Sequence, residues 1–199
     1  MSELGQLCSY LGIEVAQEGA RITLSQRAYA LKILDIARMR ECNPVHTLLE
    51  ARIKFSQQNL GSSIDSAHFR SLIGSLRYLT HSRPDLIFSV GLLSRFMENP
   101  TSEHLSGIKW ILRYVRETID YDLVYEKGQT EAKLVNYSDS DFAGDEEDRK
   151  STSRHAFFLG DMLISWASEV KISSSIFMLG RVYCCHYCRM SGRVAESIF

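Results

Sequence analysis

The stretch Tyr137-Ser138-Asp139-Ser140-Asp141-Phe142-Ala143-Gly144-Asp145, followed by Arg149-Lys150-Ser151-Thr152-Ser153, is the most informative part of this sequence. Leu134 and Val135 lead into it as a short apolar strand. Asp139 then lies where a carboxylate can leave a sheet and bind a hard cation through oxygen. The stretch therefore predicts carboxylates at a strand end, where a metal-dependent nuclease would hold its ions.

The stretch also resembles a known family. It is similar to the opening of the RNase H domain in the Pol polyprotein of copia-type retrotransposons, with Phe142 in place of the usual Trp and Arg154 in place of the usual Gly. Further motifs resemble the reverse transcriptase of the same polyprotein, in family order: Tyr10-Leu11-Gly12-Ile13-Glu14-Val15, Arg70-Ser71-Leu72-Ile73-Gly74-Ser75-Leu76, Arg83-Pro84-Asp85-Leu86, Leu93-Ser94-Arg95-Phe96-Met97 and Leu112-Arg113-Tyr114-Val115. The similarity extends from about Tyr10 to about Lys171.

The resemblance implies an α+β fold in three segments. Residues 1–120 would be the C-terminal region of a reverse transcriptase, with a primer-grip β-hairpin and thumb/connection-like helices. Residues 121–171 would be the N-terminal half of an RNase H-like domain, an incomplete α/β sheet. Residues 172–199 diverge from the family. We interpret them as a frameshifted tail, because back-translation of residues 180–196, read one base later, gives the family's next helix.

Apolar periodicity predicts the elements of these segments. The expected helices span Gln26–Met39 with Ser25 as N-cap, Ser66–Leu79, Pro84–Met97, and Ser102–Thr118 with Thr101 or Ser102 as cap. The expected strands are Ser9–Val15, Arg21–Leu24, Tyr121–Tyr125, Lys133–Tyr137, His155–Leu159 and Met162–Trp166. The first two strands also fit an ordinary surface hairpin that caps the helices. One helical core is expected from Leu72, Ile73, Leu76, Leu79, Leu86, Phe88, Val90, Leu93, Ile108, Ile111 and Leu112.

RNase H chemistry requires two divalent ions about 4 Å apart, held by several convergent carboxylates. The resemblance implies that Asp139 is the first catalytic aspartate and a ligand of Mg²⁺, whereas Asp141 and Asp145 are structural or solvated. The family's second ligand is a Glu in an Ala-Glu-Tyr-Ile-Ala helix. This chain has Gly-Arg-Val-Tyr-Cys-Cys at 180–185 instead. We therefore expect Asp139 to be the remnant of an incomplete site.

One helix carries a basic face. Lys109, Arg113 and Arg116 are spaced at i, i+4 and i+7 and point the same way, and Arg95 can add to them. These side chains would contact the phosphates of an RNA–DNA hybrid or a template-primer duplex, the partners that the resemblance implies. The alternative is a solvated face, balanced by Glu117 and Asp120.

Composition limits the classes of function. Lys and Arg number 23 against 24 Asp and Glu, a net charge of -1, which argues against a binder that holds nucleic acid by a strongly basic surface. No apolar run approaches the ~20 residues that cross a bilayer, and no secretory signal is visible, so we expect no membrane association and an intracellular location, in cytoplasm or nucleus. Cys185 and Cys188 have zinc-like spacing but lack a second pair of ligands, so the frameshift explains them better.

Two classes of function remain. The first is a fragment of a copia-type Pol protein, related to RNA-directed DNA polymerase and RNA–DNA hybrid ribonuclease but inactive as it stands. The second is a non-catalytic module that binds an RNA–DNA hybrid or an intact Pol partner.

Overall fold

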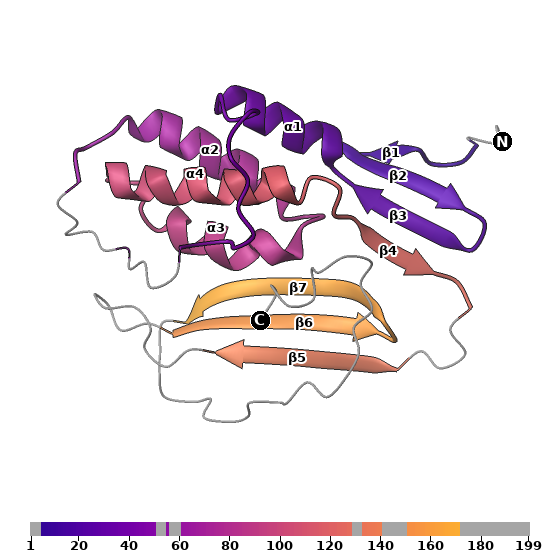
Figure 1. The fold of residues 1–199 in the computed structure, drawn as a ribbon. Helices are drawn as coiled ribbons and strands as arrows, with labels where there is room; N and C mark the ends of the chain where they lie inside the picture. Colours follow the sequence, from indigo (N-terminus) through magenta and orange to yellow (C-terminus); the bar gives the residue numbers. More distant parts are fainter. Residues whose placement is uncertain (1–4, 51–54, 56–60, 129–132, 141–150, 172–199) are drawn as a thin grey trace.

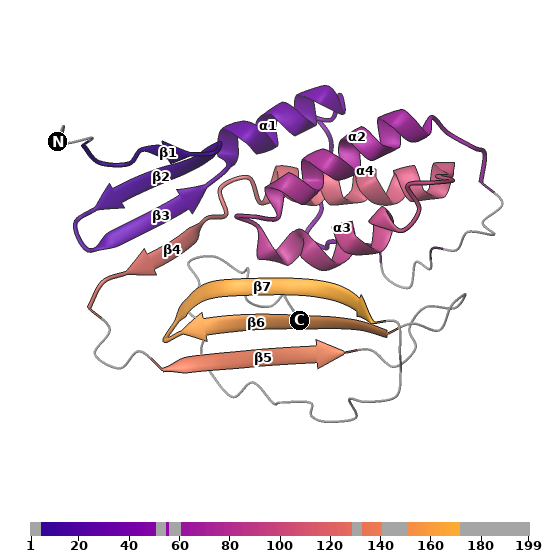
Figure 2. The ribbon, with the colours of Figure 1, turned by 180° about the vertical axis from the view of Figure 1, so that it is seen from behind.

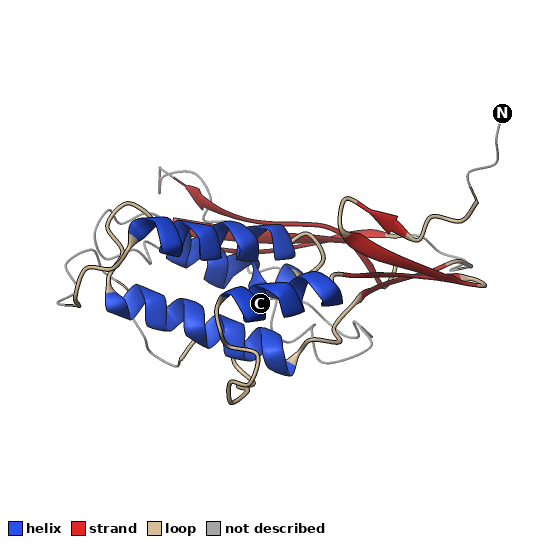
Figure 3. Ribbon diagram, turned by 90° about the horizontal axis from the view of Figure 1, so that it is seen from above, coloured by secondary structure: helices blue, strands red, loops and turns tan. Residues whose placement is uncertain are grey.

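Four α-helices and seven antiparallel strands form the part of the chain that this computed structural model describes, residues 5–50, 55, 61–128, 133–140 and 151–171. The mixture of helices and antiparallel sheets confirms the α+β class. The helices lie together, with one sheet beside α3 and another extending from α1 (Figure 1). The same arrangement is seen from behind in Figure 2. Figure 3 shows strands that project beyond the helices on one side of the molecule.

The first sheet has the strand order β1-β2-β3-β4, with β1 at Ser9–Tyr10, β2 at Ile13–Glu18, β3 at Arg21–Ser25 and β4 at Leu123–Glu126. The prediction of one strand over Ser9–Val15 is wrong, because the chain turns back at Leu11 and Gly12, whose φ angles are 47° and 75°. Positive φ angles at both central residues are typical of a two-residue hairpin turn. The Tyr78 hydroxyl donates a hydrogen bond to the Leu11 carbonyl oxygen and holds this turn against the helices.

The first helix, α1 (Arg27–Ile36), is capped from another element. The prediction of Ser25 as N-cap is wrong, because Ser25 pairs with Glu14 as the last residue of β3. Gln26 takes the N-cap position, and its side chain makes no capping hydrogen bond. The Glu14 Oε1 atom instead accepts a hydrogen bond from the Ala28 N–H at 3.0 Å. A strand carboxylate thus satisfies one of the free N–H groups at the helix start.

The remaining helices are α2 (Ser66–Leu79), the 3₁₀ turn η1 (Pro84–Leu86), α3 (Ile87–Ser94) and α4 (Ser102–Glu117). The predicted bounds of α2 are confirmed, and its N-cap Asp65 accepts a hydrogen bond from the Ala67 N–H at 2.9 Å. Thr101 is the N-cap of α4, one of the two caps considered. The helix predicted to reach Met97 ends at Ser94. None of the described helices has the length and apolar character that a membrane span requires.

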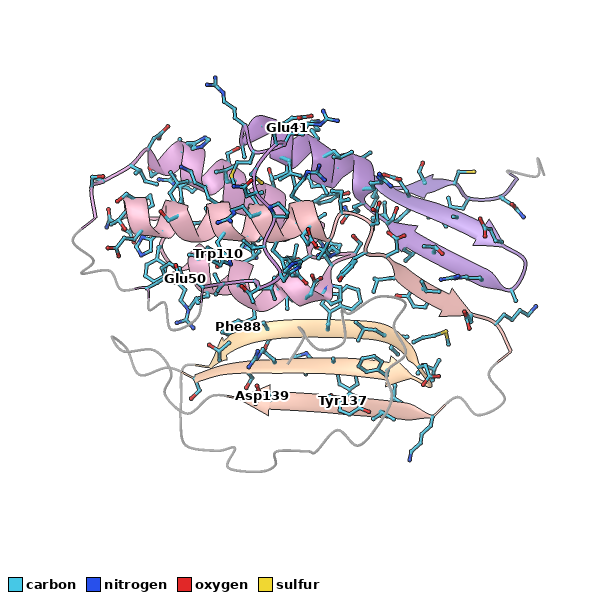
Figure 4. The ribbon with its side chains drawn as sticks, viewed as in Figure 1. Glu41, Glu50, Phe88, Trp110, Tyr137 and Asp139 are labelled. Atoms are coloured by element: carbon cyan, nitrogen blue, oxygen red, sulfur yellow. The ribbon has the colours of Figure 1, made fainter. Side chains whose placement is uncertain are left out.

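The helices enclose one hydrophobic core. All the predicted core residues are buried except Phe88, and α1 adds Ile33 and Leu34. Phe88 is half-buried and faces the second sheet instead (Figure 4). The helical periodicity therefore identified the core, and the exception marks the side of α3 that packs against another layer.

A buried ion pair closes the end of this core. The Arg83 guanidinium binds both carboxylate oxygens of Asp85, at 3.0 and 2.7 Å, and the two residues are 4% and 1% exposed. It also donates to the Thr118 carbonyl oxygen at 2.8 Å and to its hydroxyl at 2.6 Å. Burial disfavours the Arg83 charge, but the interactions with Asp85 and Tyr114 together outweigh burial and hold the pKa of the guanidinium above its ordinary value. Arg83 thereby ties the α2–α3 connection to the end of α4.

The second sheet contains β5 (Leu134–Ser140), β6 (Ser151–Leu159) and β7 (Met162–Lys171) in that order. The hairpin at Gly160 and Asp161 is confirmed, with Gly160 at φ 61°. The prediction that β4 belongs to this sheet is wrong, because β4 is hydrogen-bonded to β3 of the first sheet. Apolar alternation shows which face of a strand is buried and does not identify its partner.

The two sheets and the helices share contacts. Leu123 of β4 packs with Ala156, Phe158 and Leu163 of the second sheet in a small buried cluster. The Trp166 indole N–H of β7 donates to the Thr80 carbonyl oxygen at the end of α2, at 3.0 Å. These contacts fix the second sheet against the helical part.

The carboxyl group of Asp122, next to Leu123 of β4, should make the stability of the fold depend on pH. Burial, and then the charges of Asp120 and Glu14, raise the pKa of Asp122 above its ordinary value, while Arg83 and Arg27 oppose the shift. A carboxyl with a raised folded-state pKa stabilises the fold below its unfolded pKa, and this contribution is lost as pH rises through the folded pKa. We therefore expect Asp122→Asn to raise the urea midpoint at pH 7. The gain should vanish at pH 3, below the usual aspartate pKa of about 3.9. An equal or lower midpoint at pH 7 would contradict this assignment.

Several sequence predictions lie outside the described residues. They concern the carboxylates Asp141 and Asp145 and the tail at 172–199, which we interpret as frameshifted. The zinc-like pair Cys185 and Cys188 belongs to the same tail. All of these stay predictions.

Candidate functional site

Asp139, the predicted catalytic remnant, lies near the end of β5 and directly opposite Arg154 of β6. Its Oδ2 atom is 2.5 Å from Nη2 of Arg154. The side chains are 42% and 23% exposed, so the pair is partly shielded from water. The Asp139 carboxylate, which the resemblance assigns to a metal ion, is therefore paired with the guanidinium of Arg154.

Arg154 also contacts the helical part. Its Cζ atom lies 4.6 Å from the ring centroid of Phe88 on α3, a cation–π geometry. Figure 4 labels Asp139 on β5 and Phe88 on the side of the sheet next to α3. Arg154 thus connects β5, its own strand β6 and α3. Its contact with Phe88 explains why the Phe88 side chain faces the sheet and is not part of the helical core.

The predicted basic face of α4 holds a neighbouring segment of this chain. The Arg113 Nε–H donates to the Asn43 carbonyl oxygen at 2.6 Å, and the Arg116 Nε–H donates to that of Arg40 at 2.9 Å. The indole N–H of Trp110, which is labelled in Figure 4, donates to the Thr47 carbonyl oxygen at 2.9 Å. The Arg113 Cζ atom lies 5.2 Å from the centroid of the Trp110 ring. Lys109 is exposed. The structure brings these predicted residues onto one helix, and their contact with nucleic acid stays a prediction.

Arg95, the fourth predicted cation, lies on a different element. It follows α3, and its Nη2 atom donates to the Thr152 hydroxyl of β6 at 3.0 Å. Both residues line a cavity of about 590 Å³ between α2, α3 and the second sheet. Arg77 of α2 and His81, two residues after α2, line the same cavity. Among the described residues, this lining includes Arg77, His81 and Arg95 but no Asp or Glu.

Comparison with known proteins identifies relatives of this chain. It is 39% identical over 164 residues to the retrovirus-related Pol polyprotein from transposon RE1 of Arabidopsis thaliana. This alignment covers 82% of the chain and 11% of the polyprotein. The corresponding polyprotein from transposon TNT 1-94 of Nicotiana tabacum is 34% identical over 180 residues, 86% of the chain and 13% of that protein. An uncharacterized mitochondrial protein of Arabidopsis thaliana is 35% identical over 169 residues, 85% of the chain and 70% of that protein.

The chain is similar to a segment of the retrovirus-related Pol polyproteins of transposons. It spans only 11 to 13% of the length of the Pol polyproteins that it matches. No family model matches the chain, and no solved structure matches it.

The resemblance to Pol implies a magnesium site at Asp139, and the described residues around Asp139 do not fit one. A two-ion site needs several convergent carboxylates. Within the described ranges, no three His, Cys, Asp or Glu side chains lie where they could share a metal ion. The group that faces Asp139 is a guanidinium, which offers no acceptor atom to a cation and repels it. We therefore derive no metal-dependent step from this arrangement.

Two arginines of this Pol segment have structural partners that the sequence analysis did not identify. Arg154 carries a sequence signal, because it stands where the resemblance expects glycine, but its pairing with Asp139 depends on the register of β5 against β6. Arg83 carries a weaker one. It lies two residues before Asp85, and this spacing does not by itself show that the pair is buried.

Proposed function

We propose that this chain is a segment of a copia-type Pol polyprotein that joins the C-terminal region of a reverse transcriptase, residues 1–120, to the N-terminal half of an RNase H-like domain, residues 121–171. The observation that supports it most is the antiparallel sheet β5-β6-β7, with Asp139 near the end of its first strand, following a helical part. A single alignment to a Pol polyprotein covers 82% of the chain. The boundary at residue 120 comes from the resemblance. Because β4 (Leu123–Glu126) pairs with β3, we propose that the boundary lies instead between β4 and β5.

The resemblance implies that the N-terminal hairpin is a primer grip, and this assignment competes with an ordinary structural role. Glu14 caps α1, and the Leu11 carbonyl oxygen accepts a hydrogen bond from Tyr78. Both contacts hold the hairpin against the helices of the same chain. They support the structural role that the sequence analysis gave as its alternative.

The chain by itself should have neither polymerase nor nuclease activity. Its sequence contains no Tyr-Val-Asp-Asp, the motif that carries the palm aspartate pair in this family. Asp139 is paired with Arg154, and no set of three ligands surrounds it among the described residues. With Mg²⁺ or Mn²⁺, we expect no primer extension and no cleavage of a labelled RNA–DNA hybrid above background. Hybrid cleavage that disappears in an Asp139→Asn variant would overturn this proposal.

A non-catalytic nucleic-acid-binding module is the second candidate. The observation that favours it is the basic lining of the cavity, where Arg77 is exposed and forms no ion pair with a described residue. A filter-binding titration with RNA–DNA hybrid at two salt concentrations tests it. Each phosphate contact contributes about 0.9 to the slope of log affinity against log salt, so Arg77→Gln should reduce that slope by about 0.9. The control Arg21→Gln, on the first sheet, should leave the slope unchanged. Absence of salt-dependent binding rules this candidate out.

A further inference from the structure

The strand-end carboxylate is bound from within the chain. We propose that the Arg154 guanidinium takes the place of a metal ion at Asp139, so that this site is closed to divalent cations by the protein itself. The inference rests on the proposed RNase H-like assignment of β5–β7, which makes Asp139 the carboxylate to which a cation would bind. It assigns a role to Arg154, the residue at which the sequence departs from the glycine that the resemblance expects.

Three elements hold the guanidinium in place. Arg154 is the direct cross-strand partner of Asp139, so the 2.5 Å contact requires no movement of either strand. The Phe88 ring of α3 contacts the same guanidinium at 4.6 Å. On its other side in the sheet, Arg154 is paired with Ser168 of β7, a small residue that leaves room for a long side chain. Packing on Phe88 and pairing with Asp139 act together, so the group is positioned more firmly than in an ordinary exposed ion pair.

A second guanidinium is bound on the same strand. Thr152 lies two residues before Arg154 and thus on the same face of β6, and it accepts a hydrogen bond from Arg95 at 3.0 Å. Arg154 is the cation that contacts Asp139 directly. A divalent cation that approached Asp139 would meet the positive charge of Arg154, which opposes its binding at short range.

The test measures binding of Mn²⁺ to the full chain by paramagnetic broadening of backbone amide signals. In the wild type, signals of β5 and β6 around Asp139 should not broaden selectively. In Arg154→Gly and Arg154→Gln they should broaden at Mn²⁺ concentrations at least about tenfold lower, because a repelling charge next to the carboxylate is gone. The double variant Arg154→Gln/Asp139→Asn should lose this broadening. Arg154→Gln keeps a side chain of similar length, so it remains informative if the glycine variant fails to fold.

Two controls separate charge from space. Arg154→Lys keeps a positive charge at the same position and should exclude Mn²⁺ as the wild type does. Arg95→Gln removes a cation bound to Thr152 rather than to Asp139, so its effect should be smaller than that of Arg154→Gln. Selective broadening around Asp139 in the wild type, or no gain in either Arg154 variant, would overturn the inference. Neither result depends on hybrid cleavage, which tests the proposed function separately.

Discussion

Replacement of Arg83 by alanine is expected to destabilise the protein by about 3–5 kcal/mol, the range for breaking a buried ion pair from one side. Asp85 is 1% exposed, and Arg83 is the group that binds both of its carboxylate oxygens. The alanine variant leaves this charge buried without its cation and removes the donors to Thr118. Urea unfolding followed by circular dichroism measures the loss as a lower midpoint at unchanged slope.

The matched control is a second Arg–Asp pair of the same chain. The Arg40 Nη1 atom is 3.1 Å from the Asp35 Oδ2 atom, but the two side chains are 55% and 49% exposed. Exposed pairs contribute about 0–1 kcal/mol, so Arg40→Ala should have a small effect. The double variant Arg83→Met/Asp85→Leu should recover much of the loss, because it buries no charge. A loss in Arg83→Ala no greater than in Arg40→Ala would show that the buried pair does not stabilise the fold.

Truncation of Leu112 to alanine should cost about 2–5 kcal/mol, the range for large-to-small changes in a core. Leu112 is fully buried in the middle of α4, beside Ile108 and Ile111, which are also fully buried. The change removes buried methyl groups and leaves a cavity that the surrounding helices fill only in part. The loss should appear as a lower midpoint in the same urea unfolding experiment.

Two substitutions serve as controls for this result. Leu112→Met conserves volume and should cost less than about 1.5 kcal/mol. Leu7→Ala makes the same truncation at a side chain that is 51% exposed, and its effect should be small. A tolerated Leu112→Ala would mean that α4 does not pack in the helical core.

Much of the helical part could be predicted because its signals are local. The apolar spacing within α2 and α4 predicts where these helices lie in the sequence, and it predicts Leu76 and Leu112 as core residues, which the structure confirms. Helix caps were predictable where the capping residue adjoins the helix, as at Thr101, and not at α1, where Glu14 comes from a strand. A side chain from a distant part of the chain leaves no pattern near the helix that it caps.

The candidate site was only partly predictable for the same reason. The residue types around Asp139 indicated a carboxylate at a strand end, and β5 places Asp139 there. The pairing of Asp139 with Arg154 depends on register across the connection at 141–150, and the approach of Phe88 depends on how α3 packs against the sheet. Sequence pattern carries information about which face of an element is apolar, but not about which charged groups two elements bring together.

The sequence by itself thus determined most of the helices and of the helical core, because both follow from apolar spacing along the chain. Its motifs carried the resemblance to Pol polyproteins, because residue types in a fixed order can be compared without a structure. Only the tertiary structure decided that β4 joins the first sheet, that Arg83 and Asp85 are buried together, and that Asp139 faces a guanidinium. The strength of an electrostatic interaction depends on distance and burial between groups that are often remote in sequence. Those quantities are set by the packing of whole elements.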